Sequence, residues 1–348
     1  MFEIVRSDNA AFDKLWLDLW NKDKIQHPYY QPFTRAWFKE FEPKGREVED
    51  LSFVGIFDGK AILGVLLMVY VDKHGNYRLS CSGKNIIYIE ELDDDYATLN
   101  STYIGYKKFK KEMDGILNEY PTASMIFWDH LYNNQLSFFG RYLLNRGAIA
   151  TPYLTQVINL TNENEILHAN LRKSYKSLIN WGSNNLEIKL INHNSIAVDD
   201  IENFRLIHLH AAGKETRSKK SWQLQYDMVV NNEAFLILGE LDKELVTGMF
   251  MLISPKFCYY GIGASKRELF NKPLSHALMW KSILYAKNEG CQYFEVGDQV
   301  YPKQSNKYSY GSYEDNRKIL PPDDKYLKIS QYKRGFGGKT IIRLDIRW

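Results

Sequence analysis

The sequence has few cysteines, little net charge and no apolar run long enough to span a membrane. Its three cysteines, Cys81, Cys258 and Cys291, are scattered and show no Cys-x-x-Cys spacing, so neither a disulfide framework nor a zinc site is expected. The longest apolar run covers residues 61–71 and is too short for a transmembrane helix. The net charge of +3 excludes a strongly cationic nucleic-acid-binding surface, but it is compatible with a local basic patch.

The rest of the composition is that of a globular protein with a full core. A chain of 348 residues exceeds one typical domain, so two domains or one doubled architecture is expected. The first residues, Met1–Arg6, favour a β-strand and lack the apolar run and cleavage site of a signal peptide. We therefore expect a cytoplasmic protein without an integral membrane segment. The sequence leaves its oligomeric state open.

Two segments of the chain share one pattern. Residues 53–64 have the layout strand, tight turn, strand, and residues 235–248 repeat it. In each, a turn aspartate (Asp58 or Asp242) precedes a strand glycine by six residues, and Asp-Gly at the first turn is a strong hairpin signal. The pattern predicts two matching β-hairpins.

The repeat continues beyond the hairpins. An amphipathic helix is predicted over about residues 103–119 and another over 274–288, each followed by a strand that ends in an acid, 124–129 and 293–298. An offset kept across five elements predicts two copies of one α/β (α+β) unit. Each copy is expected to hold a mixed, mostly antiparallel sheet flanked by helices.

We place the domain boundary where the repeat is interrupted, which gives domains 1–155 and 156–348. Just after this boundary, residues 167–181 are predicted to form one basic amphipathic helix ended by Gly182. A further helix is expected over residues 199–211.

The segment Gln331–Gly338 combines an aromatic residue, two cations and three glycines. Glycine-rich backbone turns sharply or lets a ligand approach closely, and cations beside such a bend suit an anion. On residue types alone, a strand-entry loop with solvated charges is the favoured alternative.

With the doubled unit, the second half resembles the FemABX family of aminoacyl ligases and the related FemAB-like acetyltransferases, which consist of two tandem GNAT-type domains. The resemblance covers about residues 160–345, whereas the first 150 residues match in architecture only. Its motifs occur in a fixed order: Gly261–Ser265, Pro273-Leu274, Ala286–Gly290, Tyr293–Asp298, and Tyr332-Lys333 shortly before Phe336–Gly338.

The resemblance implies transfer of an acyl or aminoacyl group to an amine of a cell-envelope precursor, such as a nucleotide- or lipid-linked sugar or peptide. It implies acyl-CoA or aminoacyl-tRNA as the donor and no permanently bound cofactor. The alternative is a non-catalytic ligand-binding protein with the same doubled fold. A ligand screen against acyl-CoAs and charged tRNA separates the two.

The sequence departs from CoA-dependent GNAT enzymes before the second helix. Their pyrophosphate loop is rich in glycine, whereas Arg267–Pro273 has none, and Asp93–Asp95 precedes the first helix. Both features weaken a phosphate cradle at a helix N-terminus. This favours an aminoacyl-tRNA-like donor mode, or CoA held mainly by side chains. No long heptad segment is present, so tRNA binding by a coiled-coil arm is not supported.

Three residues are catalytic candidates. The resemblance places Lys333 at the reacting ester, where its cation stabilises the oxyanion; the alternative is a solvated lysine at a strand end. Asp298 and Glu295, on a predicted strand, are candidates to accept the proton of the amine. Their alternative is a capping role at the end of that strand.

Six further residues are candidates for substrate binding. Arg217 belongs to a cluster of cations suited to a diphosphate, and the same role is considered for Arg172 and Lys173, although charge runs are usually solvated. Ser265 and Tyr332 belong to the motifs of the resemblance, and Tyr260 belongs to the strand that leads to Gly261–Ser265.

Two other groups contain histidine or aromatic side chains. The aromatic loop His27–Phe33 is an acceptor-side wall or, as the favoured reading, a hydrophobic cluster. His208 and His210 do not share a helix face, and no third ligand is evident, so no metal site is expected.

Overall fold

A computed structural model describes residues 2–41, 45–91, 96–131, 134–301 and 324–348; the acidic run Asp93–Asp95 lies outside them. The chain forms two compact units. The first consists of Met1–Gln26, Phe38–Tyr153 and Ile342–Trp348, and the second consists of His27–Trp37 and Leu154–Ile341. The predicted boundary at residue 155 stays a prediction.

The first unit contains a four-stranded antiparallel sheet of order β1-β3-β4-β7 and a group of strands of order β15-β8-β6-β5-β2, in which β6 and β8 run parallel. Its elements are β1 (Phe2–Arg6), α1 (Phe12–Lys22), β2 (Arg46–Asp50), β3 (Phe53–Phe57), β4 (Lys60–Leu66), β5 (Met68–Val71), β6 (Tyr77–Ser80), β7 (Ile87–Glu90), α3 (Tyr96–Glu119), β8 (Ser124–Asp129) and α4 (Phe138–Asn145).

Helices α1 and α3 cover opposite faces of the four-stranded sheet. Gly64 of β4 lies against Trp16 and Leu19 of α1, whereas its neighbour Leu63 lies close to Gly105 of α3. Because consecutive strand residues point to opposite faces, the two contacts place α1 and α3 on opposite faces of the sheet.

The second unit has a sheet of order β10-β11-β12-β13-β14-β9, in which the β13–β14 pair is parallel and the others are antiparallel. Its elements are a 3-10 turn η1 (Pro28–Tyr30), α5 (Asn164–Ala169), α6 (Lys173–Asn185), β10 (Glu187–Ile191), α7 (Val198–Ala212), α8 (Lys219–Val230), β11 (Ala234–Leu241), β12 (Glu244–Ile253), β13 (Phe257–Ser265), a 3-10 turn η3 (Arg267–Leu269), α9 (Leu274–Asn288), β14 (Tyr293–Asp298) and α10 (Asp324–Arg334). The elements α2 (Pro32–Phe41), β9 (Ile149–Asn159) and β15 (Lys339–Arg347) are divided between the units.

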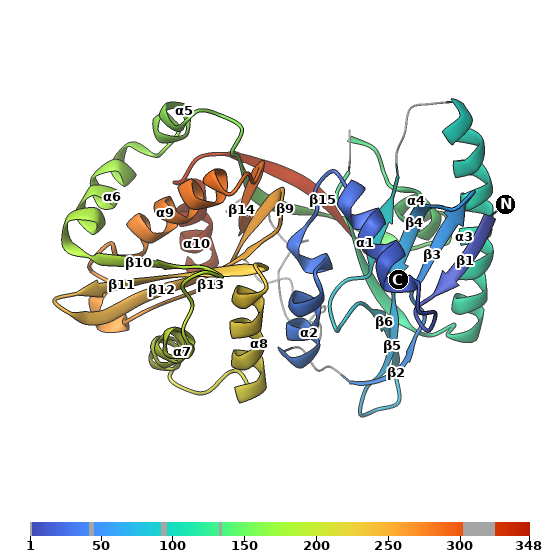
Figure 1. Ribbon diagram of the computed structural model, residues 1–348, viewed down its shortest axis with the longest axis horizontal. Helices are drawn as coiled ribbons and strands as arrows, with labels where there is room; N and C mark the ends of the chain where they lie inside the picture. Colours follow the sequence, from blue (N-terminus) through green and yellow to red (C-terminus); the bar gives the residue numbers. More distant parts are fainter. Residues whose placement is uncertain (1, 42–44, 92–95, 132–133, 302–323) are drawn as a thin grey trace. The chain divides into compact units, whose positions relative to one another are not determined.

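Helices cover both faces of the second unit's sheet. Figure 1 shows α6, α9 and α10 on one side of β10–β13, and α7 and α8 on the other. The largest buried cluster of the unit includes Met249, Leu278 and Phe294, and therefore joins strands β12 and β14 to α9. The first unit has its own cluster, which includes Phe53, Phe109 and Phe139.

Both predicted hairpins are confirmed. In the first, Asp58 and Gly59 join β3 to β4 with φ of 45° and 79°; in the second, Asp242 and Lys243 join β11 to β12 with φ of 53° and 68°. The left-handed backbone at both turn positions matches the twist of the flanking strands. The predicted helix 274–288 is also confirmed as α9.

The prediction for residues 167–182 was wrong in two respects. The segment forms two helices, α5 and α6, and Gly182 lies inside α6 rather than after it. A Cβ on Gly182 would lie 2.6 Å from the Cβ of Ala277 on α9. The glycine is therefore explained by close packing of two helices, not by a helix end.

The segment of residues 27–37 is attached to the second unit by side-chain hydrogen bonds. The carboxylate of Glu233 accepts from the backbone N–H groups of Phe33 (3.1 Å) and Thr34 (2.7 Å), at the start of α2. The Gln31 amide donates to the carbonyl of Ile253 (2.7 Å). The segment is therefore held at its middle by partners more than 190 residues away in the sequence.

In the described part of the chain, no helix is both long enough and apolar enough to cross a bilayer.

Candidate active site

A β-bulge in β14 brings the two candidate acids to one face of the sheet. Residues three apart on a regular strand point to opposite faces. In β14, however, Glu295 pairs with Val157 and Asp298 pairs with Thr155, with an irregularity between Glu295 and Gly297. Because Val157 and Thr155 are two apart on β9, they share a face, and their two partners share it as well.

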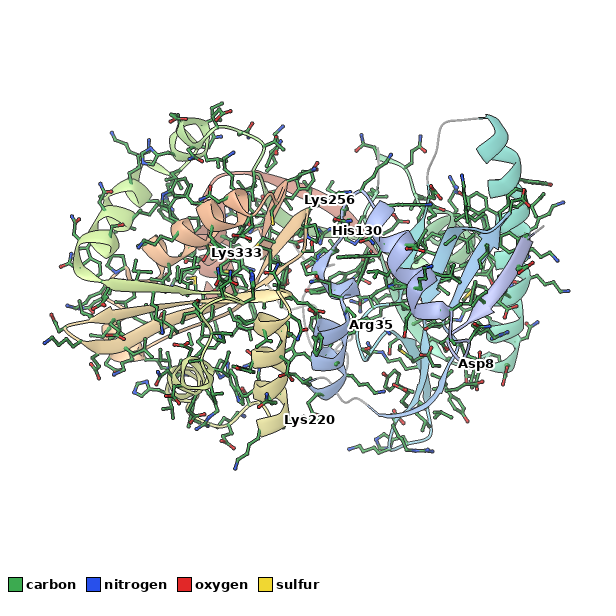
Figure 2. The ribbon with its side chains drawn as sticks, in the orientation of Figure 1. Asp8, Arg35, His130, Lys220, Lys256 and Lys333 are labelled. Carbon is green, nitrogen blue, oxygen red and sulfur yellow. The ribbon has the colours of Figure 1, made fainter. Side chains whose placement is uncertain are left out.

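Lys333 reaches this acidic pair from α10. The residue lies in the last turn of α10, not at a strand end, so the alternative of a solvated strand-end lysine was wrong. Figure 2 shows Lys333 within the second unit. Gly297 leaves room for the ammonium, because a Cβ there would lie 2.8 Å from the Lys333 Nζ atom.

Burial and the acids act on Lys333 in opposite directions. Burial lowers the pKa of the Lys333 ammonium, while the negative charges of Asp298 and then Glu295 raise it, and the net shift is downward. Burial disfavours the charged form and nearby carboxylates favour it. Without the two acids, the half-buried Lys333 ammonium would lose its proton at a still lower pH.

Glu295 is a fully buried carboxylate, with 1% of its surface exposed. The Thr155 hydroxyl donates to its Oε1 atom over 2.7 Å, and the Nε2 atom of His27 lies 3.7 Å from its Oε2 atom. Thr155 and His27 are buried too. Asp298, by contrast, is half-buried at the end of β14.

Two phenols lie beside these acids. Tyr29 of η1 makes a hydrogen bond with Tyr259 of β13, and the ring centroids are 5.4 Å apart. Burial, Tyr259 and the charges of Glu295 and Asp298 raise the pKa of Tyr29. Its hydroxyl group therefore stays protonated next to the carboxylates. The aromatic loop of residues 27–33 is thus part of this cluster.

Strands β13 and β14 stop pairing at Tyr259 and Glu295, beside the acids and phenols. Parallel pairing joins Phe257–Tyr259 of β13 to Tyr293–Glu295 of β14. Both strands continue further, and along that continuation Gly261 and Gly263 of β13 are exposed. A strand that leaves its neighbour presents N–H and C=O groups on that side, and glycine lets a ligand approach them closely.

Tyr332 belongs to an aromatic group on the other side of the sheet. Its ring lies 5.2 Å from those of His276 and Phe336, and its hydroxyl donates to the Ser275 carbonyl over 3.4 Å. Burial raises the pKa of Tyr332 far above its usual value and lowers that of His276 to about 4. The group is therefore uncharged at neutral pH and packs the C-terminal end of α10 against α9.

The glycine-rich bend turns as the sequence predicts. Gly337 and Gly338 have φ of 87° and 79°, values that favour glycine. Gln156 donates from Nε2 to the Gly337 carbonyl over 2.7 Å. The Arg334 guanidinium lies 4.7 Å from the centroid of the Tyr301 ring and donates to Gln299 over 3.0 Å, so it braces this region.

Arg172 and Lys173 lie at the start of α6. Arg172 is its N-cap residue, and its backbone N–H donates to the Gly335 carbonyl over 2.9 Å. Its side chain makes a hydrogen bond with Tyr175. Lys173 is exposed. Both residues therefore lie near the glycine-rich bend, and their role in substrate binding stays a prediction.

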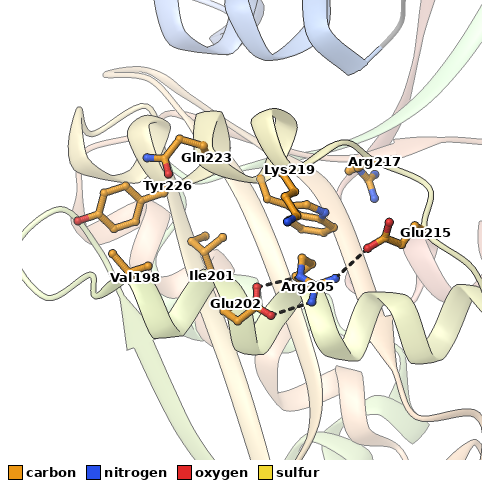
Figure 3. Close-up of a pocket in the computed structure, with 10 residues that line it drawn as sticks. Val198, Ile201, Glu202, Arg205, Glu215, Arg217, Lys219, Gln223 and Tyr226 are labelled. Carbon is orange, nitrogen blue, oxygen red and sulfur yellow. Dashed lines mark hydrogen bonds and ion pairs between the residues drawn. The ribbon is translucent and has the colours of Figure 1, made fainter.

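Arg217 lines a groove of about 400 Å³ between α7 and α8 (Figure 3). Its guanidinium lies 2.5 Å from the Nε2 atom of His208 and 5.5 Å from the centroid of the Trp222 ring. Burial lowers its pKa to about 10, and burial together with Arg217 lowers the pKa of His208 to about 4. His208 is therefore a neutral acceptor for a half-buried cation.

The groove contains charges of both signs. Arg205 forms ion pairs with Glu202 (2.7 Å) and Glu215 (3.2 Å) (Figure 3), and Lys219 adds a further cation. The groove is therefore not a purely cationic phosphate site. The role predicted for Arg217 stays a prediction.

The last two candidates lie on β13. Tyr260 is half-buried, and burial raises its pKa to about 12. The Ser265 hydroxyl lies 2.8 Å from that of Thr247 on β12. The structure thus brings Lys333, Asp298 and Glu295 together, while Arg217 and Ser265 have other local partners. Among the described residues, no group of three or more His, Cys, Asp or Glu side chains is placed to hold a metal ion.

Comparison with known proteins supplies the class of fold. No protein-family model matches the sequence, and no curated protein matches it. Among solved structures, FemX aligns with 89% of this chain and 94% of its own at a TM-score of 0.62 and 12% identity. A tandem GNAT protein from the clavulanic acid biosynthesis pathway aligns with 100% of this chain and 97% of its own at 0.53 and 12%. L-PGS from Bacillus licheniformis aligns with 91% of each chain at 0.53 and 12%.

These likenesses, at low identity, concern the fold. The chain has a mixed α/β fold of the tandem GNAT type, shared with FemX, and the predicted fold class is confirmed. The structural resemblance to FemABX proteins is confirmed at the same level.

Proposed function

We propose that this protein transfers an acyl or aminoacyl group to an amine of a cell-envelope precursor, with Lys333 at the reacting carbonyl. The observation that carries the proposal is the Lys333 ammonium, held at Gly297 next to two carboxylates on one face of β14. The fold shared with FemX supports the same reading. The donor is an aminoacyl-tRNA or an acyl-CoA, used as a substrate rather than as a bound cofactor.

The proposed reaction needs no covalent enzyme intermediate. The amine nitrogen attacks the carbonyl carbon of the donor, and the new C–N bond turns the carbonyl oxygen into an oxyanion. The Lys333 ammonium stabilises that charge. The C–O or C–S bond to the donor then breaks. Asp298 accepts the proton released by the amine and returns it to the leaving oxygen or sulfur, so that an amide and a free alcohol or thiol result.

Asp298 is preferred over Glu295 as the proton acceptor because of access. A general base must come within hydrogen-bonding distance of the proton that it removes. Asp298 is half-buried at the end of β14, whereas Glu295 is enclosed and already accepts from Thr155. The donor would lie where β13 and β14 separate, along Tyr260–Gly263 and near Tyr332. This position uses exposed strand backbone in place of a glycine-rich loop.

The remaining assignments follow the same proposal. Arg217, and Arg172 with Lys173, would bind anionic parts of the donor or the acceptor, and Ser265 would contact substrate at the end of β13. Both donor classes are made in the cytoplasm, which is where we place the reaction.

The test is substitution of Lys333 by Met in a transfer assay. Nucleotide- and lipid-linked precursors with a free amine are incubated with acyl-CoAs or aminoacyl-tRNAs, and the amide product is detected by mass spectrometry. Loss of one oxyanion donor costs about 100-fold to 1000-fold in kcat, and we expect a loss of at least that order for Lys333→Met.

Lys287→Met is the matched control. The Lys287 ammonium donates to the carbonyls of Leu160 and Asn162, each over 2.9 Å, so this variant removes another partly buried lysine of the same unit and should keep its turnover. A folded Lys333→Met protein with near wild-type turnover would overturn the role of Lys333. Ligand binding without transfer across the whole panel would favour the non-catalytic alternative.

A further inference from the structure

We propose that Glu295 acts as the buried counter-charge of Lys333, not as a proton acceptor, and that Thr155 and His27 keep it ionised. In this role Glu295, Thr155 and His27 are positioning residues. The inference rests on the proposed function for the catalytic role of the Lys333 ammonium. The interactions that it describes, however, are those of the protein without substrate.

The Thr155 hydroxyl and the His27 ring both lie at the Glu295 carboxylate. An isolated carboxylate is costly to bury unless hydrogen bonds or an opposite charge compensate it. The Thr155 hydroxyl supplies one short hydrogen bond of 2.7 Å. A hydroxyl that donates to a carboxylate stabilises the ionised form, so this bond favours the charge of Glu295.

The contacts of His27 define the tautomer of its ring. The backbone N–H of Tyr29 donates to the Nδ1 atom of His27 over 3.3 Å, so Nδ1 bears a lone pair and the ring proton is on Nε2. Nε2 is the atom that faces Glu295, at 3.7 Å. A neutral imidazole therefore presents its N–H side to the carboxylate without cancelling the negative charge that Lys333 requires.

The negative charge of Glu295 acts on Lys333. Among the described residues, the titratable groups beside Lys333 and Glu295 include His27, Asp298 on the same strand, Tyr29 from η1 and Tyr259 from β13. The Tyr29 phenol stays neutral, because burial, Tyr259 and the two acids all raise its pKa. Asp298 has to take up and release a proton in the proposed reaction. Glu295 is therefore the constant negative charge of the cluster.

The two supporting residues come from distant parts of the chain. Thr155 is on β9, and His27 belongs to the segment of residues 27–37 that Glu233 and Gln31 attach to the second unit. The ring of His27 packs 4.9 Å from that of Phe257. The charge state of Lys333 thus depends on the correct packing of residues 27–37 in the second unit.

The experiment measures the titration of Lys333 directly. The full chain, without substrate, is treated with acetic anhydride over a range of pH, and the acetylation of each lysine is followed by peptide mass spectrometry. The unprotonated amine reacts, so the midpoint of the Lys333 profile follows its pKa. Lys287 of the same unit serves as the internal reference for folding.

We expect Glu295→Gln to lower the Lys333 midpoint by about one pH unit or more, which is about a tenfold faster reaction at a fixed pH below the midpoint. Thr155→Val and His27→Phe should lower it in the same direction by less. Thr155→Ser, which keeps the hydroxyl, and His27→Gln, which keeps an N–H donor, should restore it. In the Glu295→Gln background, Thr155→Val should have no further effect.

An unchanged Lys333 midpoint in a folded Glu295→Gln protein overturns the counter-charge. A lowered midpoint in Glu295→Gln, with no shift in either Thr155→Val or His27→Phe, overturns the role of the two supporting residues. If Glu295→Gln does not fold, the comparison of Thr155→Val with Thr155→Ser decides alone. Because no substrate is used, these results are independent of whether transfer is found, whereas Lys333→Met in the transfer assay tests the proposed function by itself.

Discussion

Substitution of Gly297 by Ala tests how closely the position of Lys333 is set. Gly297 has φ of 103°, and an added Cβ would lie 2.8 Å from the Lys333 Nζ atom. To reach ordinary van der Waals contact at 3.4 Å, the ammonium has to retreat by about 0.6 Å. The end of a lysine side chain moves easily, so the displacement itself should cost little stability.

Two effects of different size follow. A non-glycine residue in this backbone region costs about 1–3 kcal/mol of stability. A misplacement of about 1 Å at a reacting centre can cost about 100-fold in rate, so a retreat of about half that distance should lower kcat by about tenfold or more. It should also change the pH midpoint of Lys333, since the ammonium moves relative to the acids.

Gly290→Ala separates the two effects. Gly290 precedes β14, has φ of 90° and has open space around its missing side chain, so alanine there brings the same kind of backbone strain without contact to Lys333. Stability is measured by urea unfolding, turnover by the transfer assay and the Lys333 midpoint by acetylation. If Gly297→Ala and Gly290→Ala lose similar stability and keep the same turnover and the same midpoint, the proposed dependence on Gly297 is wrong.

Two further predictions concern stability. In the folded state the pKa values of His208 and His276 are lowered to about 4. As the pH falls from 6.5 towards 4, the unfolded chain binds protons that the folded chain does not, so each histidine should lower the free energy of unfolding by about 1–2 kcal/mol by pH 5. In urea unfolding at pH 7 and pH 5, His276→Phe should therefore lose less stability than the wild-type protein. Gly182→Ala should destabilise the protein by about 1–3 kcal/mol, because the added Cβ meets Ala277. Gly115→Ala should stabilise it by about 0.5–1 kcal/mol, because Gly115 has open space around it in α3. Thermal unfolding of both variants measures the two changes, and changes of the same sign would contradict the packing argument.

The parts of the fold that depend on local sequence were predictable. Asp58 and Gly59 specify a left-handed turn whatever surrounds them, and the helix 274–288 follows from its own apolar period and from Pro273 at its start. The doubled unit was visible because the same local signals recur in the same order. Gly182 shows the limit of such signals. Residue type alone does not distinguish a glycine where two helices pack closely from a glycine that ends a helix, and only the neighbouring Ala277 distinguishes the two cases.

The candidate site was predictable for the residues named by motifs, and not for the residues that surround them. Lys333, Asp298 and Glu295 lie together, but regular strand alternation would turn the two acids to opposite faces. They share a face only because a bulge shifts the register between Glu295 and Gly297. Gly297 is the local signal of that bulge, because a glycine inside a strand often marks one, but it does not specify how the register shifts. His27 and Thr155 were missed because their partner is distant in the sequence; the dense aromatic loop at residues 27–33 was the one available signal.

The division of the chain between the units has a consequence for its synthesis. Residues 27–37 are synthesised about 200 residues before the groups that hold them, Glu233 and the carbonyl of Ile253. Conversely, the first unit takes its last segment from Ile342–Trp348. The first unit therefore cannot complete its contacts until residues 342–348 are made, and division of the chain at residue 155 leaves each half without a segment that belongs to its unit.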